Sequence, residues 1–165
     1  MDHSPVVGDT PESRSTYYRT QCGLAVVVKP GGTIVVKAGG SLAALTMPVE
    51  LGCAVKVELD ARNVSCGPIV AHTRSRRWTF LVDWIPALDP GASLDAEMMR
   101  ANVMVIRTGG EIALPSPASS AIERQWVYNP GTFCRPSADA VLKIIRHCAR
   151  VRAAWNAQGA VWLPR

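Results

Sequence analysis

The sequence predicts an α+β fold in which a mostly antiparallel sheet is flanked by two or three helices. Short β-branched runs separated by turns that contain glycine or proline recur between residues 24 and 128. Two longer stretches, residues 46–62 and 137–159, place apolar side chains three and four positions apart, as on the buried face of a helix. Apolar residues make up 48% of the 165 residues, which suits one folded core. We therefore expect a single α+β domain over residues 19–165.

The first 18 residues are polar, contain prolines and serines, and lack the apolar segment of a secretory signal. They predict a flexible N-terminal tail over residues 1–18, with Tyr17 and Tyr18 as its anchor to the folded body. No apolar run reaches the length needed to span a bilayer. We expect a cytoplasmic protein without a membrane partner.

The five cysteines are scattered along the chain, and no two form a Cys-x-x-Cys pair. This spacing predicts reduced thiols and argues against a disulfide framework or a zinc site.

The first half of the domain is expected to contain a hairpin and a helix. Residues 24–28 and 33–37 are apolar runs joined by Pro30-Gly31-Gly32, which predicts a β-hairpin. Thr46 is expected to cap a helix that ends near Arg62, because Pro48 is tolerated in a first helical turn. Its predicted buried face is formed by Leu51, Val55 and Leu59.

Residues 66–84 predict a second hairpin with a strongly basic turn. Trp78, Phe80 and Val82 occupy alternate positions, a pattern typical of a half-buried strand. The turn between the strands carries three arginines within four residues, Arg74, Arg76 and Arg77. Their guanidinium groups suit a phosphate or carboxylate partner, and a plain solvated loop is the alternative. For Trp78 the alternatives are a stacking platform and a packed core residue.

The second half of the domain is expected to end in a long helix. Ser93 is expected to cap a short helix, and residues 103–107 and 111–114 predict a third hairpin around Gly109-Gly110. Residues 125–128 predict a further strand, and Ser137 is expected to cap the last helix. Its apolar stripe is Val141, Ile144, Ile145, Cys148, Val151 and Trp155. Its opposite face is basic, and this face either meets water or helps to hold a polyanion.

Two fragments carry a family resemblance. Residues 71–80, Ala-His-Thr-Arg-Ser-Arg-Arg-Trp-Thr-Phe, resemble a degenerate copy of the Thr-Pro-Ser-Gly-Gly-x-His-x-Tyr-Phe segment of primase-polymerase (prim-pol) domains in the archaeo-eukaryotic primase superfamily. Residues 109–116 resemble the family's glycine turn, strand and Pro-Pro-Ser segment, and Arg124-Gln125-Trp126 follows where the family often has Tyr-x-Trp. The resemblance is closest to short actinobacterial bifunctional primase/polymerase-like proteins, and it implies an RRM/primase-like core.

The catalytic residues of that family are not found in this sequence. Prim-pol enzymes hold metal ions with an Asp-x-Asp on a strand, and the acidic pairs with this spacing here are Glu58-x-Asp60 and Asp95-x-Glu97. Both pairs fall in predicted helices, where side chains two positions apart diverge. Arg77 stands at the position of the family's histidine. We therefore predict no catalytic residue, no metal and no cofactor, although the spacing leaves a Cys66–His72 nucleophile pair open.

The resemblance and the net charge of +5 predict a catalytically inactive prim-pol-like protein that binds nucleic acid or nucleotide. The alternative is a regulatory or scaffolding module whose partner is an acidic protein surface. The residues predicted to bind nucleic acid are Arg74, Arg76, Arg77, Trp78, Ser116, Arg124, Trp126, Lys143, Arg146 and Arg150.

Overall fold

The computed structural model of this chain describes residues 9–84, 90–118, 123–131 and 134–157. Its helices are α1 (Pro11–Thr20), α2 (Val49–Ala61), α3 (Ala92–Arg100) and α4 (Ala138–Ala157). Its strands are β1 (Val26–Val28), β2 (Ile34–Lys37), β3 (Leu42–Pro48), β4 (Ile69–His72), β5 (Arg77–Asp83), β6 (Met104–Ile106), β7 (Glu111–Leu114) and β8 (Arg124–Tyr128). The predicted α+β class is confirmed.

The strands form two antiparallel sheets. The larger sheet has the order β6-β3-β5-β4-β8, and the smaller has the order β1-β2-β7. Along the chain, β3-α2-β4-β5-α3-β6 is the β-α-β-β-α-β arrangement of ferredoxin-like and RRM-like domains. The expected RRM-like core is therefore present. Unrelated functions share this arrangement, so the topology alone carries no functional conclusion.

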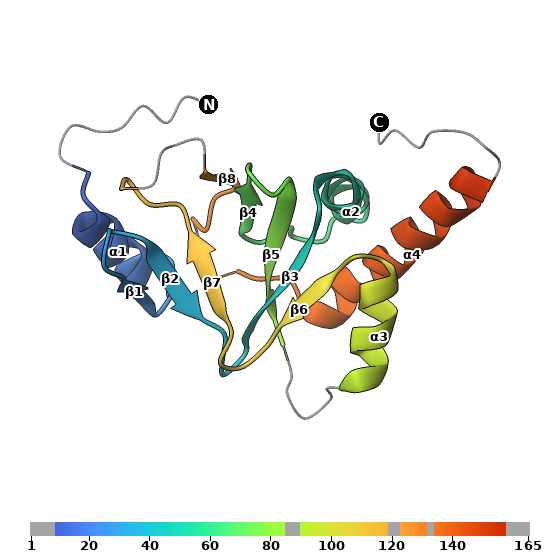
Figure 1. Ribbon diagram of the computed structural model, residues 1–165, viewed down its shortest axis with the longest axis horizontal. Coiled ribbons are helices and arrows are strands. Elements are labelled where there is room, and N and C mark those ends of the chain that lie inside the picture. Colours follow the sequence, from blue (N-terminus) through green and yellow to red (C-terminus); the bar gives the residue numbers. More distant parts are fainter. Residues whose placement is uncertain (1–8, 85–89, 119–122, 132–133, 158–165) are drawn as a thin grey trace.

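The larger sheet is covered on both faces (Figure 1). Helices α2, α3 and α4 pack on one face, where the core includes Phe80 and Val82 of β5. The smaller sheet and α1 cover the other face, where the core includes Leu81 of β5, Ala44 of β3 and Val70 of β4. The prediction that β5 is half-buried is wrong, because its alternate side chains enter two different cores.

The predicted hairpins have different outcomes. The pairs β1–β2 and β4–β5 are confirmed as antiparallel neighbours. The third hairpin is wrong, because β6 pairs with β3 in the larger sheet and β7 pairs with β2 in the smaller one. The turn between them contains Gly109, whose φ of +91° suits glycine, and it leads the chain from one sheet to the other.

Two of the predicted helix starts are wrong. Thr46 lies in β3, where its Oγ1 hydrogen-bonds Thr79 Oγ1 at 2.9 Å, so it does not cap α2. The chain stays extended up to Pro48, consistent with the bias that a proline imposes on the residue before it. Ser93 lies inside α3, whose N-cap is Gly91. Ser137 does accept a hydrogen bond from the Ala140 amide at 3.2 Å, as expected of a cap.

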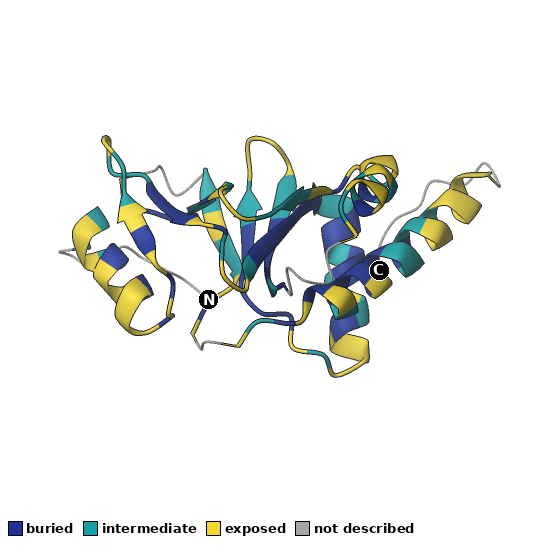
Figure 2. Ribbon diagram, turned by 90° about the horizontal axis from the view of Figure 1, so that it is seen from below, coloured by how far each residue is buried: buried dark blue, intermediate teal, exposed yellow. Residues whose placement is uncertain are grey.

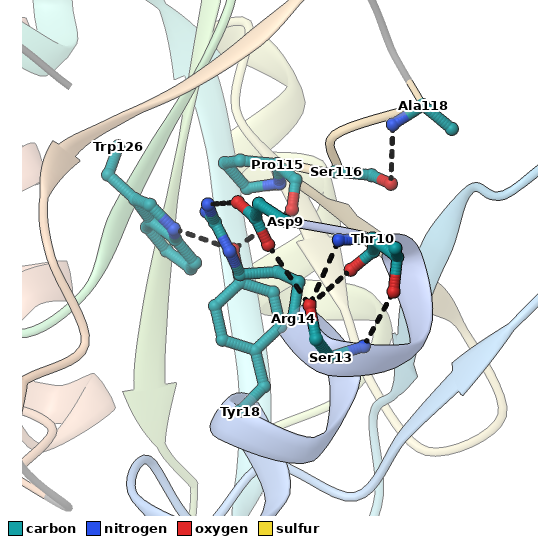
Figure 3. A network of polar contacts seen from close by, with 9 residues as sticks. All are labelled: Asp9, Thr10, Ser13, Arg14, Tyr18, Pro115, Ser116, Ala118 and Trp126. Carbon is teal, nitrogen blue, oxygen red and sulfur yellow. Dashed lines mark hydrogen bonds and ion pairs between the residues drawn. The ribbon is translucent and has the colours of Figure 1, made fainter. Parts of the chain in front are cut away.

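Part of the predicted tail is a docked helix. Residues 11–18 lie in α1, which begins with a reciprocal capping box between Thr10 and Ser13. Tyr18 is 1% exposed, donates to Pro115 O at 2.9 Å and accepts from Trp126 Nε1 at 2.9 Å (Figure 3). An ion pair between Arg14 and Asp9 lies beside this hydroxyl. A single buried aromatic side chain anchors the helix. The segment therefore lacks the apolar stripe by which a packed helix is recognised in a sequence.

The helices within the described ranges do not combine the length and hydropathy that a membrane span requires.

Tyr18 joins α1 to both sheets, so removing its hydroxyl should destabilise the fold. We expect Tyr18→Phe to lower the free energy of unfolding by roughly 1–3 kcal/mol, because Trp126 Nε1 and Pro115 O would lose their partner inside the protein. The half-exposed neighbour provides the control, and Tyr17→Phe should change stability by less than about 0.5 kcal/mol. Urea denaturation measures both variants, and equal losses would contradict this role of the Tyr18 hydroxyl.

Candidate nucleic-acid interface

The basic turn at residues 73–76 is closed by one backbone hydrogen bond of its own and is joined to neighbouring segments by two more. The Arg76 amide donates to Thr73 O at 3.3 Å, which closes the turn between β4 and β5. The Thr73 amide donates to Glu123 O at 3.2 Å, beside the start of β8. The Val49 amide at the start of α2 donates to Arg76 O at 3.0 Å. The side chains of this turn are therefore presented from an ordered backbone.

Arg74 and Arg76 project into solvent from this turn. Their side chains are 84% and 75% exposed. Arg74 Nη1 lies 3.5 Å from Glu123 Oε1, and Arg76 Nη2 lies 2.8 Å from Glu50 Oε1. Pairs between exposed groups contribute little to stability, so both guanidinium groups can exchange their carboxylate for another anion at small cost.

Arg76 has a backbone conformation that favours glycine. Its φ is +51°, in the left-handed region that L-residues with a side chain rarely adopt. An arginine at this position gives up local stability relative to glycine, and the fold gains no buried contact from the exposed side chain in return.

Arg77 differs from the two exposed arginines because its side chain is hydrogen-bonded to other segments of the fold. It donates to Thr46 O at 3.0 Å, to Asn102 O at 2.7 Å and to Asn102 Oδ1 at 3.1 Å. These bonds join β5 to the end of β3 and to the connection between α3 and β6. The side chain of Arg77 is therefore engaged by the fold, unlike those of Arg74 and Arg76.

A row of basic side chains crosses the sheet beside the turn. His72 lies directly opposite Arg77 on β5 and directly opposite Arg124 on β8, so all three side chains lie on the same face. His72 Nε2 hydrogen-bonds Thr79 Oγ1 at 2.9 Å. Burial lowers the pKa of His72, and the charges of Arg124 and Arg77 lower it further. Sequence reasoning selected Arg124 and missed His72, which is found only from the strand register.

A shallow hollow of about 250 Å³ adjoins the turn. Its wall is formed by Val49, Ala71, His72, Thr73, Arg76, Arg77 and Trp78. The hollow places the exposed Arg76 beside the row that contains His72.

Trp78, Trp126 and Ser116 are held by the fold. Trp78 packs against the helix-side core over Gly52, where an added Cβ would lie 3.0 Å from the indole ring. Trp126 makes an edge-to-face contact with Tyr18, with ring centroids 5.8 Å apart (Figure 3). Ser116 is buried and donates to Gly32 O. Trp78 therefore packs against the core and also forms part of the hollow beside the turn, whereas Ser116 and Trp126 do not line that hollow.

The basic face of α4 is separate from the turn. The helix starts beside Asp83, at the end of β5 opposite the turn. Lys143 forms an exposed pair with Asp139 at 2.7 Å, and Arg146 makes two bonds to Glu97 of α3 at 2.7 and 2.8 Å. Arg150 is exposed.

The apolar stripe of α4 is buried only as far as Cys148. Val151 and Trp155 remain 44% and 46% exposed where the helix extends past the body of the protein (Figure 2). The expectation of a fully packed stripe is therefore wrong for its last two members.

Both acidic pairs lie on helices, as predicted. On α2, Glu58 pairs with Arg62 at 2.9 Å and Asp60 pairs with Lys56 at 2.7 Å. On α3, the carboxylates of Asp95 and Glu97 pair with Arg107 and Arg146. Within the described ranges, His, Cys, Asp and Glu side chains do not gather in groups of three or more that could hold a metal ion.

Cys66 and His72 have different partners. Cys66 Sγ donates to Asp60 Oδ1 at 2.9 Å, whereas the imidazole bonds Thr79. Burial and this hydrogen bond to Asp60 raise the pKa of Cys66 to about 12. The thiol is therefore held in its unreactive protonated form, and the nucleophile pair that the spacing left open is not formed.

Comparison with known proteins gives no match: no family model, no curated protein and no solved structure is significantly similar to this chain. The resemblance to prim-pol domains therefore rests on the two sequence fragments.

The lowered pKa of His72 predicts a pH dependence of stability. The unfolded chain takes up a proton near pH 6.5, before the folded protein does, so the free energy of unfolding should fall as the pH drops below about 6.5. We expect His72→Gln to lose less stability than the wild type between about pH 7.5 and pH 5.5. Denaturation at both pH values measures this difference, and an equal loss in the two proteins would contradict the assignment.

Proposed function

We propose that this protein binds nucleic acid without catalysis, through phosphate contacts made by Arg74 and Arg76. The observation that carries the proposal is that two guanidinium groups project, 84% and 75% exposed, from a turn whose backbone is bonded to neighbouring elements. Because the backbone is already ordered, binding does not carry the additional cost of ordering a loop. The net charge of +5 favours approach to a polyanion.

The row beside the turn adds positive charge to the same end of the sheet. Arg124 is 25% exposed and has Glu123 as a distant carboxylate neighbour at 3.9 Å. Arg77 keeps its hydrogen bonds to the fold, and its positive charge adds to the electrostatic attraction for a polyanion. A polymer with regularly spaced phosphates can meet the turn and the row together, which a single small anion cannot do.

The prim-pol resemblance supports the same proposal. The RRM-like topology is the one that the resemblance implies, and the acidic pairs that could replace the family's metal ligands are engaged by arginine and lysine. We infer an inactive relative of that family, in which the metal chemistry has been lost and the basic turn makes the phosphate contacts.

Replacing the two exposed arginines should weaken binding without harming the fold. We expect Arg74→Ala combined with Arg76→Gly to flatten the log–log salt dependence of duplex DNA binding by about 1.8, since each phosphate contact contributes about 0.9. Glycine is chosen at position 76 because it suits the φ of +51°. Fluorescence anisotropy against salt concentration measures the slope, and thermal melting checks the fold.

The matched control removes two charges elsewhere. Lys143→Ala combined with Arg150→Ala acts on exposed side chains of α4 and should change the slope much less. An unchanged slope in the folded turn variant, or an equal change in both variants, would remove the turn from the site.

The proposed function also predicts that the protein lacks polymerase and nucleotide-hydrolysing activity. We expect no primer extension and no nucleoside triphosphate hydrolysis with Mg²⁺ or Mn²⁺, because the paired carboxylates on α2 and α3 do not converge. Metal-dependent primer extension by the wild type that disappears in Glu58→Ala combined with Asp60→Ala would contradict the proposal.

A regulatory module with an acidic protein partner is the second candidate. It is favoured by Val151 and Trp155, which leave an apolar surface on the last turns of α4 next to Arg150 and Arg152. This candidate predicts no binding of DNA by the wild type at low salt, together with one stable protein partner.

A further inference from the structure

We propose that the ligand is the phosphate backbone of double-stranded nucleic acid, contacted without base stacking and without preference for single strands. This inference rests on the proposed function and specifies the form of nucleic acid that the turn would hold.

The sheet face that binds single strands in RRM-like domains is covered in this protein. RRM-like sheets bind single strands by stacking bases on aromatic side chains of the face that carries no helices. Here that face bears Ala44, Val70 and Leu81, which are 0% exposed and pack against the smaller sheet and α1. A base cannot reach these three side chains unless the two sheets separate. The two sheets and α1 are seen in Figure 1.

The two aromatic rings nearest the turn pack against other parts of the fold. The Trp78 ring lies over Gly52, and the Trp126 ring contacts Tyr18 and donates its N–H to the tyrosine hydroxyl. The Trp126 ring would have to leave this contact to receive a base, and Trp78, which also lines the hollow, keeps one part of its ring packed over Gly52. Stacking on an exposed aromatic stabilises binding by about 1–3 kcal/mol per base, and residues 73–76 contain no aromatic side chain that could provide it.

The exposed aromatic residues of the described chain lie on other elements. Tyr17 is on α1, and Trp155 is near the end of α4. Tyr128 is at the far end of β8 from Arg124, about 13 Å away at the usual rise of a strand. Residues 73–76 therefore offer guanidinium groups, and the aromatic residue that lines the hollow beside them, Trp78, is partly buried.

The charge density of the ligand also favours a duplex. A duplex carries one negative charge per about 1.7 Å of its axis, whereas one strand carries one per about 3.4 Å of the same axis. A site that makes phosphate contacts alone gains from the denser array. In the free protein, Glu50 pairs with Arg76 and Glu123 pairs with Arg74, so phosphates must displace these two carboxylates.

The test compares a duplex DNA of roughly 20 base pairs with each of its two strands, by fluorescence anisotropy over a series of salt concentrations. We expect the duplex to bind at least as tightly as either strand, and a second duplex of unrelated sequence to bind within about threefold of the first. A single strand that binds about tenfold or more tightly than the duplex would overturn the inference, because even one stacked base gives such a preference.

A second variant probes the displaced carboxylates. Glu50→Gln combined with Glu123→Gln should tighten duplex binding several-fold and leave the ratio of duplex to single-strand affinity at or above one. A double variant that prefers the single strand would also overturn the inference.

The outcomes separate the two proposals. No binding of any DNA by the wild type at low salt removes the proposed function and this inference together. Binding that prefers single strands and weakens in Arg74→Ala combined with Arg76→Gly keeps the proposed function and removes only this inference.

Discussion

The structure depends on the burial of its larger sheet on both faces. On β5, Phe80 and Val82 enter the core beneath the helices, while Leu81 enters the core beneath the smaller sheet. A sheet buried in this way leaves its edges, its ends and the turns between its strands for contact with other molecules. The basic turn between β4 and β5 is such a place. Backbone hydrogen bonds join it to Glu123 and to Val49, and a third hydrogen bond closes the turn itself.

Neighbouring arginines in this turn have different physical roles. Arg77 gives three hydrogen bonds to carbonyl and amide oxygens of other segments and so closes one end of the sheet. Arg76 precedes it in the chain, is exposed, and accepts a backbone φ of +51°. Backbone strain of this kind persists where the surroundings impose it, and it gathers at functional sites. The strained residue is also the one whose side chain is free to exchange partners.

Much of the fold could be predicted because its signals are local. The β1–β2 hairpin follows from two apolar runs around Pro30-Gly31-Gly32, and α4 follows from its apolar spacing. The sequence does not predict strand β3, because a strand that is buried on both faces lacks the alternation of apolar and polar residues by which strands are recognised. Its last residues instead resemble the start of the following helix. The pairing of β2 with β7 joins segments about 75 residues apart, and no local pattern specifies such a pairing.

The candidate site, like the fold, could be predicted from the sequence only where its features are local. The exposure of Arg74 and Arg76 could be expected from a charged turn, whereas the role of Arg77 depends on Asn102 and Thr46, which are 25 and 31 positions away. The row of Arg124, His72 and Arg77 depends on the register of three strands. Trp126 and Ser116 were assigned to the site through the family resemblance, but the packing of α1 and the smaller sheet engages both of them.

The central claim is that ligands meet the basic turn while the covered face of the sheet stays closed. The most direct measurement is an NMR titration of the isotopically labelled protein with duplex DNA, following every backbone amide. The account predicts shifts confined to residues 72–77, to residues 123–124 and to the start of α2. Comparable shifts at Leu81, Val36 and Ile112, in the core between the two sheets, would show that the sheets separate on binding and would contradict it.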